Sequence, residues 1–228
     1  MRVRLFITIL LISVIPAFSQ ERLAPVERSA SYEYYERVDN LLIGSGRNKF
    51  VFQVCPSFAP EVCLYFSDET RELVLREAEK SIWHTEKWYS PSTHSRKCRG
   101  RKNSITIKEY RCPISASISE KLDSLFMSAV FSSSIMSSPQ GLDGTTFELR
   151  TFWGHYAAFC WSPKRDASNC SHLVSVLEAL CEFVKDNNID GIKGLVPEID
   201  ALTAIFSDLL PQGGRIVDPE TGFVYESR

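Results

Sequence analysis

The segment between residues 145 and 161 limits the fold most, because it contains the clearest pair of strands in the chain. Polar and apolar residues alternate over residues 145–153, with Glu148 and Arg150 in the polar set. Successive side chains of a strand point to opposite faces, so we expect one buried face and one face open to water. Gly154 permits a reversal into the second strand, and so short a connection predicts antiparallel pairing.

Other segments extend this pattern to an α+β fold. Apolar and β-branched runs predict further strands at residues 50–54, 62–66 and 104–110, and a terminal hairpin at 215–225. Apolar residues spaced three and four apart predict helices at residues 69–83, 119–135, 171–186 and 197–209. Short connections favour a mainly antiparallel sheet, and we expect the amphipathic helices to pack on one face of it.

The N-terminal residues have the layout of a secretory signal peptide. Two arginines precede an apolar run at residues 5–15, and Ala17 and Ser19 supply small residues at the −3 and −1 positions. We therefore expect residues 1–19 to be removed by cleavage before Gln20. The alternative is an uncleaved membrane anchor, but the apolar run is much shorter than the about 20 residues that span a bilayer.

The rest of the chain is predicted to form one domain. We interpret residues 20–48 as a polar leader or a first helix, and residues 49–228 as a single α+β domain. The net charge of −2 becomes −4 without residues 1–19, which contain two arginines and no acidic residue. This balance argues against a surface built for nucleic acid. We expect a soluble secreted or periplasmic protein without a transmembrane segment after cleavage.

All seven cysteines follow the predicted leader. An oxidising compartment favours disulfides, and six of the cysteines form neighbouring pairs around loops: Cys55 with Cys63, Cys98 with Cys112, and Cys160 with Cys170. Cys181 is left over on the apolar stripe of the predicted helix 171–186. We therefore predict a disulfide-stabilised fold.

A zinc site is the alternative use of these cysteines. His94 and Cys98 are four residues apart, and Cys170 lies near His172, but the chain has no Cys-x-x-Cys pair and the spacing fits no common structural zinc site. We predict no metal site and no cofactor.

A basic segment is the sharpest local feature of the chain. Five cations occur within seven residues: Arg96, Lys97, Arg99, Arg101 and Lys102. Such a charge density can dock phosphate-rich envelope lipid, nucleic acid or an acidic protein surface, whereas the alternative is a solvated loop. We predict that these residues bind an unknown protein or an anionic envelope partner, without specific nucleic-acid recognition.

Catalytic motifs are missing from the sequence. The chain contains no Gly-x-Ser-x-Gly and no His-Glu-x-x-His, and we therefore predict no catalytic residue. The nearest pair of acids is Asp143 and Glu148, which a turn and a wet strand face also explain. Aromatic residues at one end of the hairpin can line a pocket or belong to the core: Trp153, His155, Tyr156 and Trp161.

We therefore predict an exported binding or inhibitory protein that presents loops to a partner. The alternative is a secreted hydrolase whose acidic residues converge only in the fold.

Overall fold

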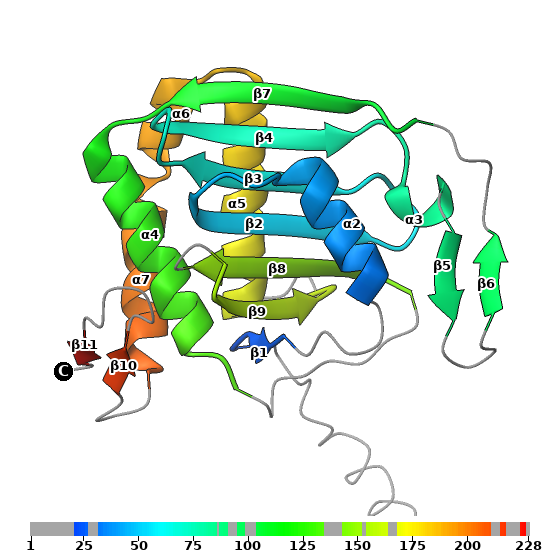
Figure 1. The fold of residues 1–228 in the computed structure, drawn as a ribbon. Helices are drawn as coiled ribbons and strands as arrows, with labels where there is room; N and C mark the ends of the chain where they lie inside the picture. Colours follow the sequence, from blue (N-terminus) through cyan, green and yellow to red (C-terminus); the bar gives the residue numbers. More distant parts are fainter. Residues whose placement is uncertain are drawn as a thin grey trace, which may run out of the picture.

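The computed structural model describes residues 21–26, 32–85, 87–90, 95–98, 104–134, 143–151, 154–163, 168–210, 215–217 and 224–226. Its main element is a seven-stranded sheet of order β1-β9-β8-β2-β3-β4-β7, in which every neighbouring pair is antiparallel (Figure 1). The predicted α+β class with a mainly antiparallel sheet is therefore confirmed. None of the helices among these residues is long and apolar enough to cross a membrane.

The strands of this sheet are β1 (Ala24–Pro25), β2 (Asn48–Pro56), β3 (Val62–Ser67), β4 (Glu72–Ala78), β7 (Ile107–Pro113), β8 (Thr145–Thr151) and β9 (Tyr156–Trp161). Two further strand pairs lie outside it: β5 (Lys87–Ser90) with β6 (Ser95–Cys98), and β10 (Arg215–Val217) with β11 (Val224–Glu226). The β8–β9 and terminal pairs agree with the sequence pattern.

The helices are α2 (Tyr32–Leu42), α3 (Ile82–Thr85), α4 (Ala116–Phe131), α5 (Asn169–Lys185), α6 (Ile189–Gly194) and α7 (Val196–Asp208). Side-chain hydroxyls of Ser115 and Ser168 cap the starts of α4 and α5, and such caps each contribute about 1 kcal/mol.

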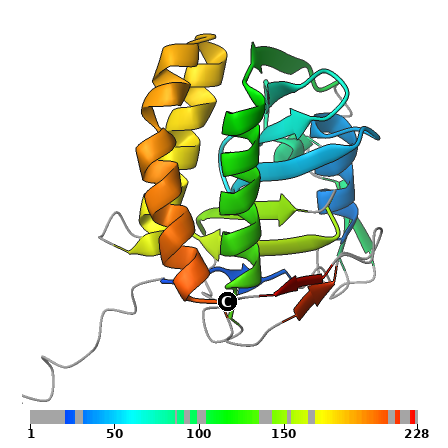
Figure 2. The same cartoon turned by 90° about the vertical axis from the view of Figure 1, so that its left-hand side faces the viewer.

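Helices cover both faces of the sheet. Figure 2 shows α4, α5 and α7 side by side on one face, and α2 on the other. The prediction of helices on one face only is therefore wrong. Its cause is α2, whose short apolar stripe of Tyr34, Val38 and Leu42 lies in a segment dominated by charges.

The predicted helix at residues 69–83 is also wrong, because this segment supplies β4. Residues 68–71 form a hairpin turn, in which the N–H of Arg71 donates to the carbonyl of Ser67 over 2.8 Å and Arg71 has a φ of 59°. β4 then pairs with β3 on one side and β7 on the other. Because both faces of a central strand are covered, its apolar residues 73–75 follow one another without alternation.

Two buried clusters fill the two faces. Under α4, α5 and α7 the cluster is apolar and includes Phe50, Phe52, Leu149 and Phe126, with the rings of Phe50 and Phe126 stacked at 4.6 Å. Under α2 and α3 a smaller cluster contains Val51, Tyr65 and Val74 together with cysteine and tyrosine side chains. Adjacent residues of one strand therefore serve different clusters.

β7 forms one edge of the sheet and is the most polar of its long strands. Lys108, Glu109 and Arg111 are exposed there. Glu109 accepts from Arg76 of β4 over 2.6 Å and from Arg111 over 2.8 Å, and Arg111 also contacts Glu72 over 3.1 Å. The exposed side of this edge strand therefore carries positive and negative side chains that are paired with one another.

Candidate functional site

The basic segment begins in a strand pair that stands apart from the main sheet. Beyond α3, β5 and β6 form their own two-stranded sheet, which we call the basic strand pair (Figure 1). Arg96 and Lys97 belong to β6, opposite Tyr89 and Trp88 of β5 in the register. The remaining predicted partner-binding residues, Arg99, Arg101 and Lys102, lie outside the described residues.

A buried carboxylate fixes the base of the basic strand pair. Glu61 is fully buried and accepts hydrogen bonds from the backbone N–H groups of Ile82 (2.7 Å) and Trp83 (3.1 Å) at the start of α3. The hydroxyls of Tyr34 (2.9 Å) and Ser81 (3.3 Å) donate to the same carboxylate. Buried polar groups need such partners, so Glu61 joins α2, β3 and α3 at one point.

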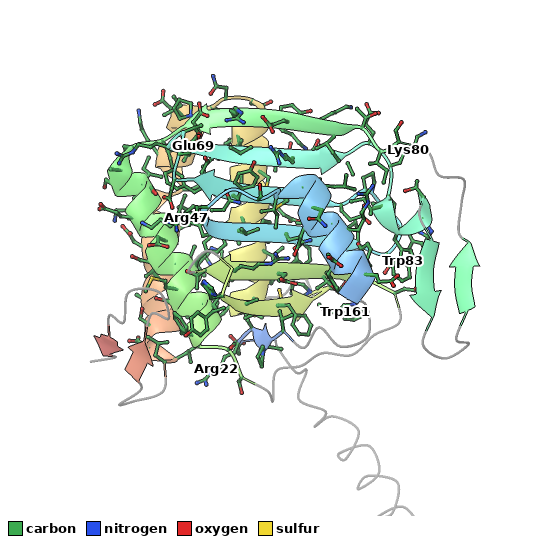
Figure 3. The ribbon with its side chains drawn as sticks, in the orientation of Figure 1. Arg22, Arg47, Glu69, Lys80, Trp83 and Trp161 are labelled. Carbon is green, nitrogen blue, oxygen red and sulfur yellow. The ribbon has the colours of Figure 1, made fainter. Side chains whose placement is uncertain are left out.

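Tyr34 completes this junction. Burial raises the pKa of its hydroxyl, and the neighbouring Cys55 and Glu61 raise it further, so Tyr34 stays a neutral donor. Its ring meets the ring of Trp83 edge to face, with centroids 5.1 Å apart. In Figure 3 the labelled Trp83 lies at the end of the main sheet on which β5 and β6 are found. The basic strand pair therefore follows α3, a short helix that is held by packing and by hydrogen bonds.

The second face of β8 is buried, which corrects the predicted wet face. Glu148 and Arg150 are 2% and 6% exposed, because α2 covers them. The alternation in the sequence separates two buried faces, one apolar and one polar. A polar set under a helix looks the same in sequence as a polar set in water, so this burial was not visible from the pattern.

Arg150 is the centre of a buried network. Its Nε donates to Glu148 over 2.6 Å, and its two terminal nitrogens bind the carboxylate of Asp39 over 2.9 and 2.7 Å. Nη2 also donates to the side-chain oxygen of Gln53. Bidentate pairing of this kind fixes geometry as well as charge, and it ties α2 to β2 and β8.

The network keeps Arg150 charged. Burial alone lowers the pKa of the guanidinium, but Glu148 and Asp39 outweigh it and raise this pKa above its ordinary value. One cation is therefore shared by two carboxylates inside the protein.

A hollow of about 280 Å³ opens beside this network. Side chains on its wall come from α2, β2 and β8 and the turn after α2: Asp39, Ile43, Asn48, Val51 and Arg150. The rest of the wall is glycine: Gly44, Gly46 and Gly154. Gly44 and Gly154 have φ values of 75° and 88°, which side chains other than glycine rarely adopt.

A bulge in β2 brings Asn48 into this wall. The pairing of β2 with β3 shifts between Asn48 and Val51. Lys49 contacts Asp123 of α4 over 3.0 Å, and Phe50 belongs to the cluster under α4, so both neighbours point to that face. The bulge thus interrupts the alternation and leaves Asn48 on the same face as Val51. Bulges often redirect a side chain next to a functional site.

Six cysteines are described, and all are buried free thiols: Cys55, Cys63, Cys112, Cys160, Cys170 and Cys181. Cys98 lies outside the described side chains. The predicted disulfide stabilisation is therefore unsupported. In the register, Cys63 lies opposite Gln53. Cys55, two residues further along β2, is therefore a diagonal neighbour of Cys63. Diagonal neighbours are about 7–8 Å apart, beyond the usual Cα separation of a disulfide, about 4.4–6.8 Å.

Thiol catalysis is disfavoured at these cysteines. Burial raises the pKa of Cys55, Cys63 and Cys181, which keeps them protonated. The histidines with described side chains are all exposed: His84, His155 and His172. Within the described ranges no three His, Cys, Asp or Glu residues gather as metal ligands.

The candidate acid pair of the hydrolase alternative is not brought together. Asp143 is exposed in the turn before β8, and Glu148 is buried at its centre. Glu148 is paired with the buried Arg150 under α2, whereas Asp143 lies at the surface before the strand, so the two carboxylates do not face one site.

The aromatic residues at the end of the hairpin are divided. The ring of Tyr156 packs against Phe131 of α4 at 5.0 Å, whereas His155 is exposed. Trp161 packs so closely on Gly144 that a Cβ there would lie 2.5 Å from its ring. Trp153 lies outside the described residues. Tyr156 and Trp161 therefore contribute to packing.

Sequence reasoning missed Asp39, Asn48, Gln53 and Glu61 as members of polar clusters. Glu148 and Arg150 gave the available signal, because residues two apart in a strand share a face. Their partners come from α2 and β2, and only the fold brings these segments together.

Comparison with protein-family models, with curated proteins and with solved structures finds no match to this chain. Function is therefore inferred from the sequence and from the geometry of the described residues.

Proposed function

We propose that this protein is an exported binding protein that recognises an anionic partner through the basic strand pair and the basic residues that follow it. The supporting observation is the position of β5 and β6 in a sheet of their own, outside the main sheet (Figure 1). A cluster of like charges on a separate element can approach a partner surface without disturbing the core.

The junction at Glu61 supports this function. A binding element that is held in place loses less freedom on association than a flexible one. The four hydrogen bonds to Glu61 fix the turn from which β5 starts. The carboxylates that meet at Arg150 are joined to a cation, which favours binding over hydrolysis as the role of this protein.

Vesicle binding tests this proposal. Residues 20–228 are mixed with anionic phosphatidylglycerol vesicles or neutral phosphatidylcholine vesicles, and co-sedimentation is measured at low and high salt. We expect binding to the anionic vesicles only, with a loss of more than tenfold in affinity at high salt. The double variant Arg99→Glu/Arg101→Glu should lose this binding.

A matched control separates local from total charge. Lys108→Glu/Lys193→Glu makes the same charge change at two exposed sites, with side chains 56% and 60% exposed, and should retain binding. Equal losses in the two double variants, or binding that ignores salt, would contradict the proposal. Binding to immobilised polyglutamate but not to vesicles would assign the partner to the acidic proteins.

Export and disulfide formation are tested separately. We propose that residues 1–19 are removed, so sequencing of the purified protein should begin at Gln20. Alkylation after unfolding without reductant counts the free thiols. One reactive cysteine would support the three predicted disulfides. Seven would support free thiols at the six cysteines that the structure describes and at Cys98.

A further inference from the structure

The hollow beside Arg150 lies at the opposite end of the sheet from the basic strand pair. In Figure 3 the labelled Arg47, adjacent to the first residue of β2, lies at one end, and Trp83 lies at the other. Antiparallel β2 and β8 place Asn48 and Arg150 near the former end and Glu61 near the latter. The hollow is therefore distinct from the proposed partner surface.

Asn48 is the first unexplained feature of this hollow. Its side chain lines the hollow and is 5% exposed, yet no acceptor in the described part of the protein binds its Nδ2. Leaving a buried amide donor without a partner costs about 1–3 kcal/mol. An acceptor in the hollow would remove this cost.

Arg150 supplies a second donor on the same wall. A guanidinium has five N–H groups, and the recorded bonds to Glu148, Asp39 and Gln53 use four of them. The fifth N–H belongs to Nη1. An amide N–H from Asn48 and a guanidinium N–H from Arg150 together match the two oxygens of a carboxylate.

A carboxylate on the same wall favours a cation in the same ligand. Asp39 lines the hollow and its side chain is 26% exposed, whereas that of Glu148 is 3% exposed. The carboxylate of Asp39 would repel a simple anion and attract an ammonium group.

We propose that this hollow binds a small zwitterion of the α-amino acid type, with its carboxylate on Asn48 and Arg150 and its ammonium group towards Asp39. The hollow of about 280 Å³ suits a ligand of this size. Its three glycines leave their part of the wall without side chains; at Gly154 an added Cβ would meet nothing within 4 Å.

Thermal unfolding with three probes tests the ligand class. Glycine carries both charges, acetate only the negative one and methylammonium only the positive one. The probes are used at about 10 mM, far below the concentrations at which glycine acts as an osmolyte. A glycine concentration ten times its Kd should raise Tm by about 3–6 °C. Acetate and methylammonium should each produce less than a third of this shift.

The variant Asn48→Leu separates binding from stability. It replaces an amide whose Nδ2 has no acceptor among the described residues with an apolar side chain of similar size. Tm without ligand should therefore stay equal or rise, while the glycine shift disappears. Asn40→Leu is the matched control, because Asn40 is exposed on α2, and it should keep the glycine shift.

Three results would overturn the proposal: an equal response of wild type and Asn48→Leu to glycine, an equal response of wild type to acetate and glycine, or a lower Tm of Asn48→Leu without ligand. The last would show that Asn48 has a structural role. Binding of glycine by wild type and Asn40→Leu alone would support the proposal.

Discussion

The two faces of the main sheet are filled differently, although the same strands supply both: one holds a large apolar cluster, and the other combines a smaller hydrophobic cluster with a buried charge network. Leu149 points into the apolar cluster under α4, α5 and α7, while its neighbour Arg150 enters the polar network under α2. The apolar face gains free energy with the area removed from water, at about 25 cal/mol per Å². The polar face gains only when each buried charge has its partner.

This difference teaches where the molecule tolerates change. Apolar cores accept other side chains of similar volume at modest cost. A buried charge network does not, because removing one member leaves the others without compensation. The α2 face should therefore be the more sensitive face, even though its buried cluster is the smaller one.

The largest effect is expected from Arg150→Met. Glu148 would remain 2% exposed without its cation, so the free energy of unfolding should fall by about 3–5 kcal/mol. Urea unfolding measures this change. Arg111→Met removes an exposed guanidinium, 43% exposed, and should cost less than about 1 kcal/mol.

A double variant sharpens the same prediction. Arg150→Met/Glu148→Leu removes both buried charges and should recover part of the stability that Arg150→Met loses. If the double variant were less stable than the single one, uncompensated charge would not explain the loss.

A smaller but still large effect is expected from Leu149→Ala on the other face. Leu149 is fully buried in the apolar cluster, and truncation of such a leucine costs about 2–5 kcal/mol through lost burial and the cavity left behind. We expect a value near the lower end, about 3 kcal/mol, by urea unfolding. Leu149→Met should cost less than about 1.5 kcal/mol. A larger loss here than in Arg150→Met would reverse the comparison of the two faces.

The smallest effect is expected at the exposed edge of the sheet, from Glu109→Gln. Burial raises the pKa of Glu109, but the hydrogen bonds from Arg76 and Arg111 outweigh it and lower this pKa below its ordinary value. A carboxyl whose pKa falls on folding stabilises the protein above its unfolded pKa, and this contribution disappears as the pH falls through the folded pKa.

Wild type should therefore exceed Glu109→Gln by at most about 1 kcal/mol at pH 7. Urea unfolding between pH 7 and pH 3 should show the two proteins converging in acid. A difference that stays constant over this range would mean that the ionised carboxylate of Glu109 is not the cause.

Much of the fold could be predicted from local pattern, and the failures share one cause. The hairpin of β8 and β9 and the helices α4, α5 and α7 follow residue periodicity, which depends only on near neighbours in sequence. The segment of β4 reads as a helix because its strand character depends on pairing with β3 and β7. Tertiary pairing overrides local propensity in such a segment.

The candidate sites divide in the same way. Arg96 and Lys97 could be selected from charge density alone, because their signal lies within a few residues. The hollow could not, because Asp39, Asn48 and Arg150 meet only after α2, β2 and β8 have assembled. The bulge at Asn48 depends on the pairing with β3, which the sequence does not display.

The charged edge strand β7 has a consequence for the behaviour of the protein in concentrated solution. An edge strand presents unpaired backbone groups that can recruit a strand from a second molecule and start a fibre. In β7 the exposed Lys108, Glu109 and Arg111 would meet their own like charges, or lose their water, when another chain docks there. The ion pairs of β7 therefore disfavour the docking of a second chain at this edge, and so disfavour aggregation, while they add little to the stability of the folded state.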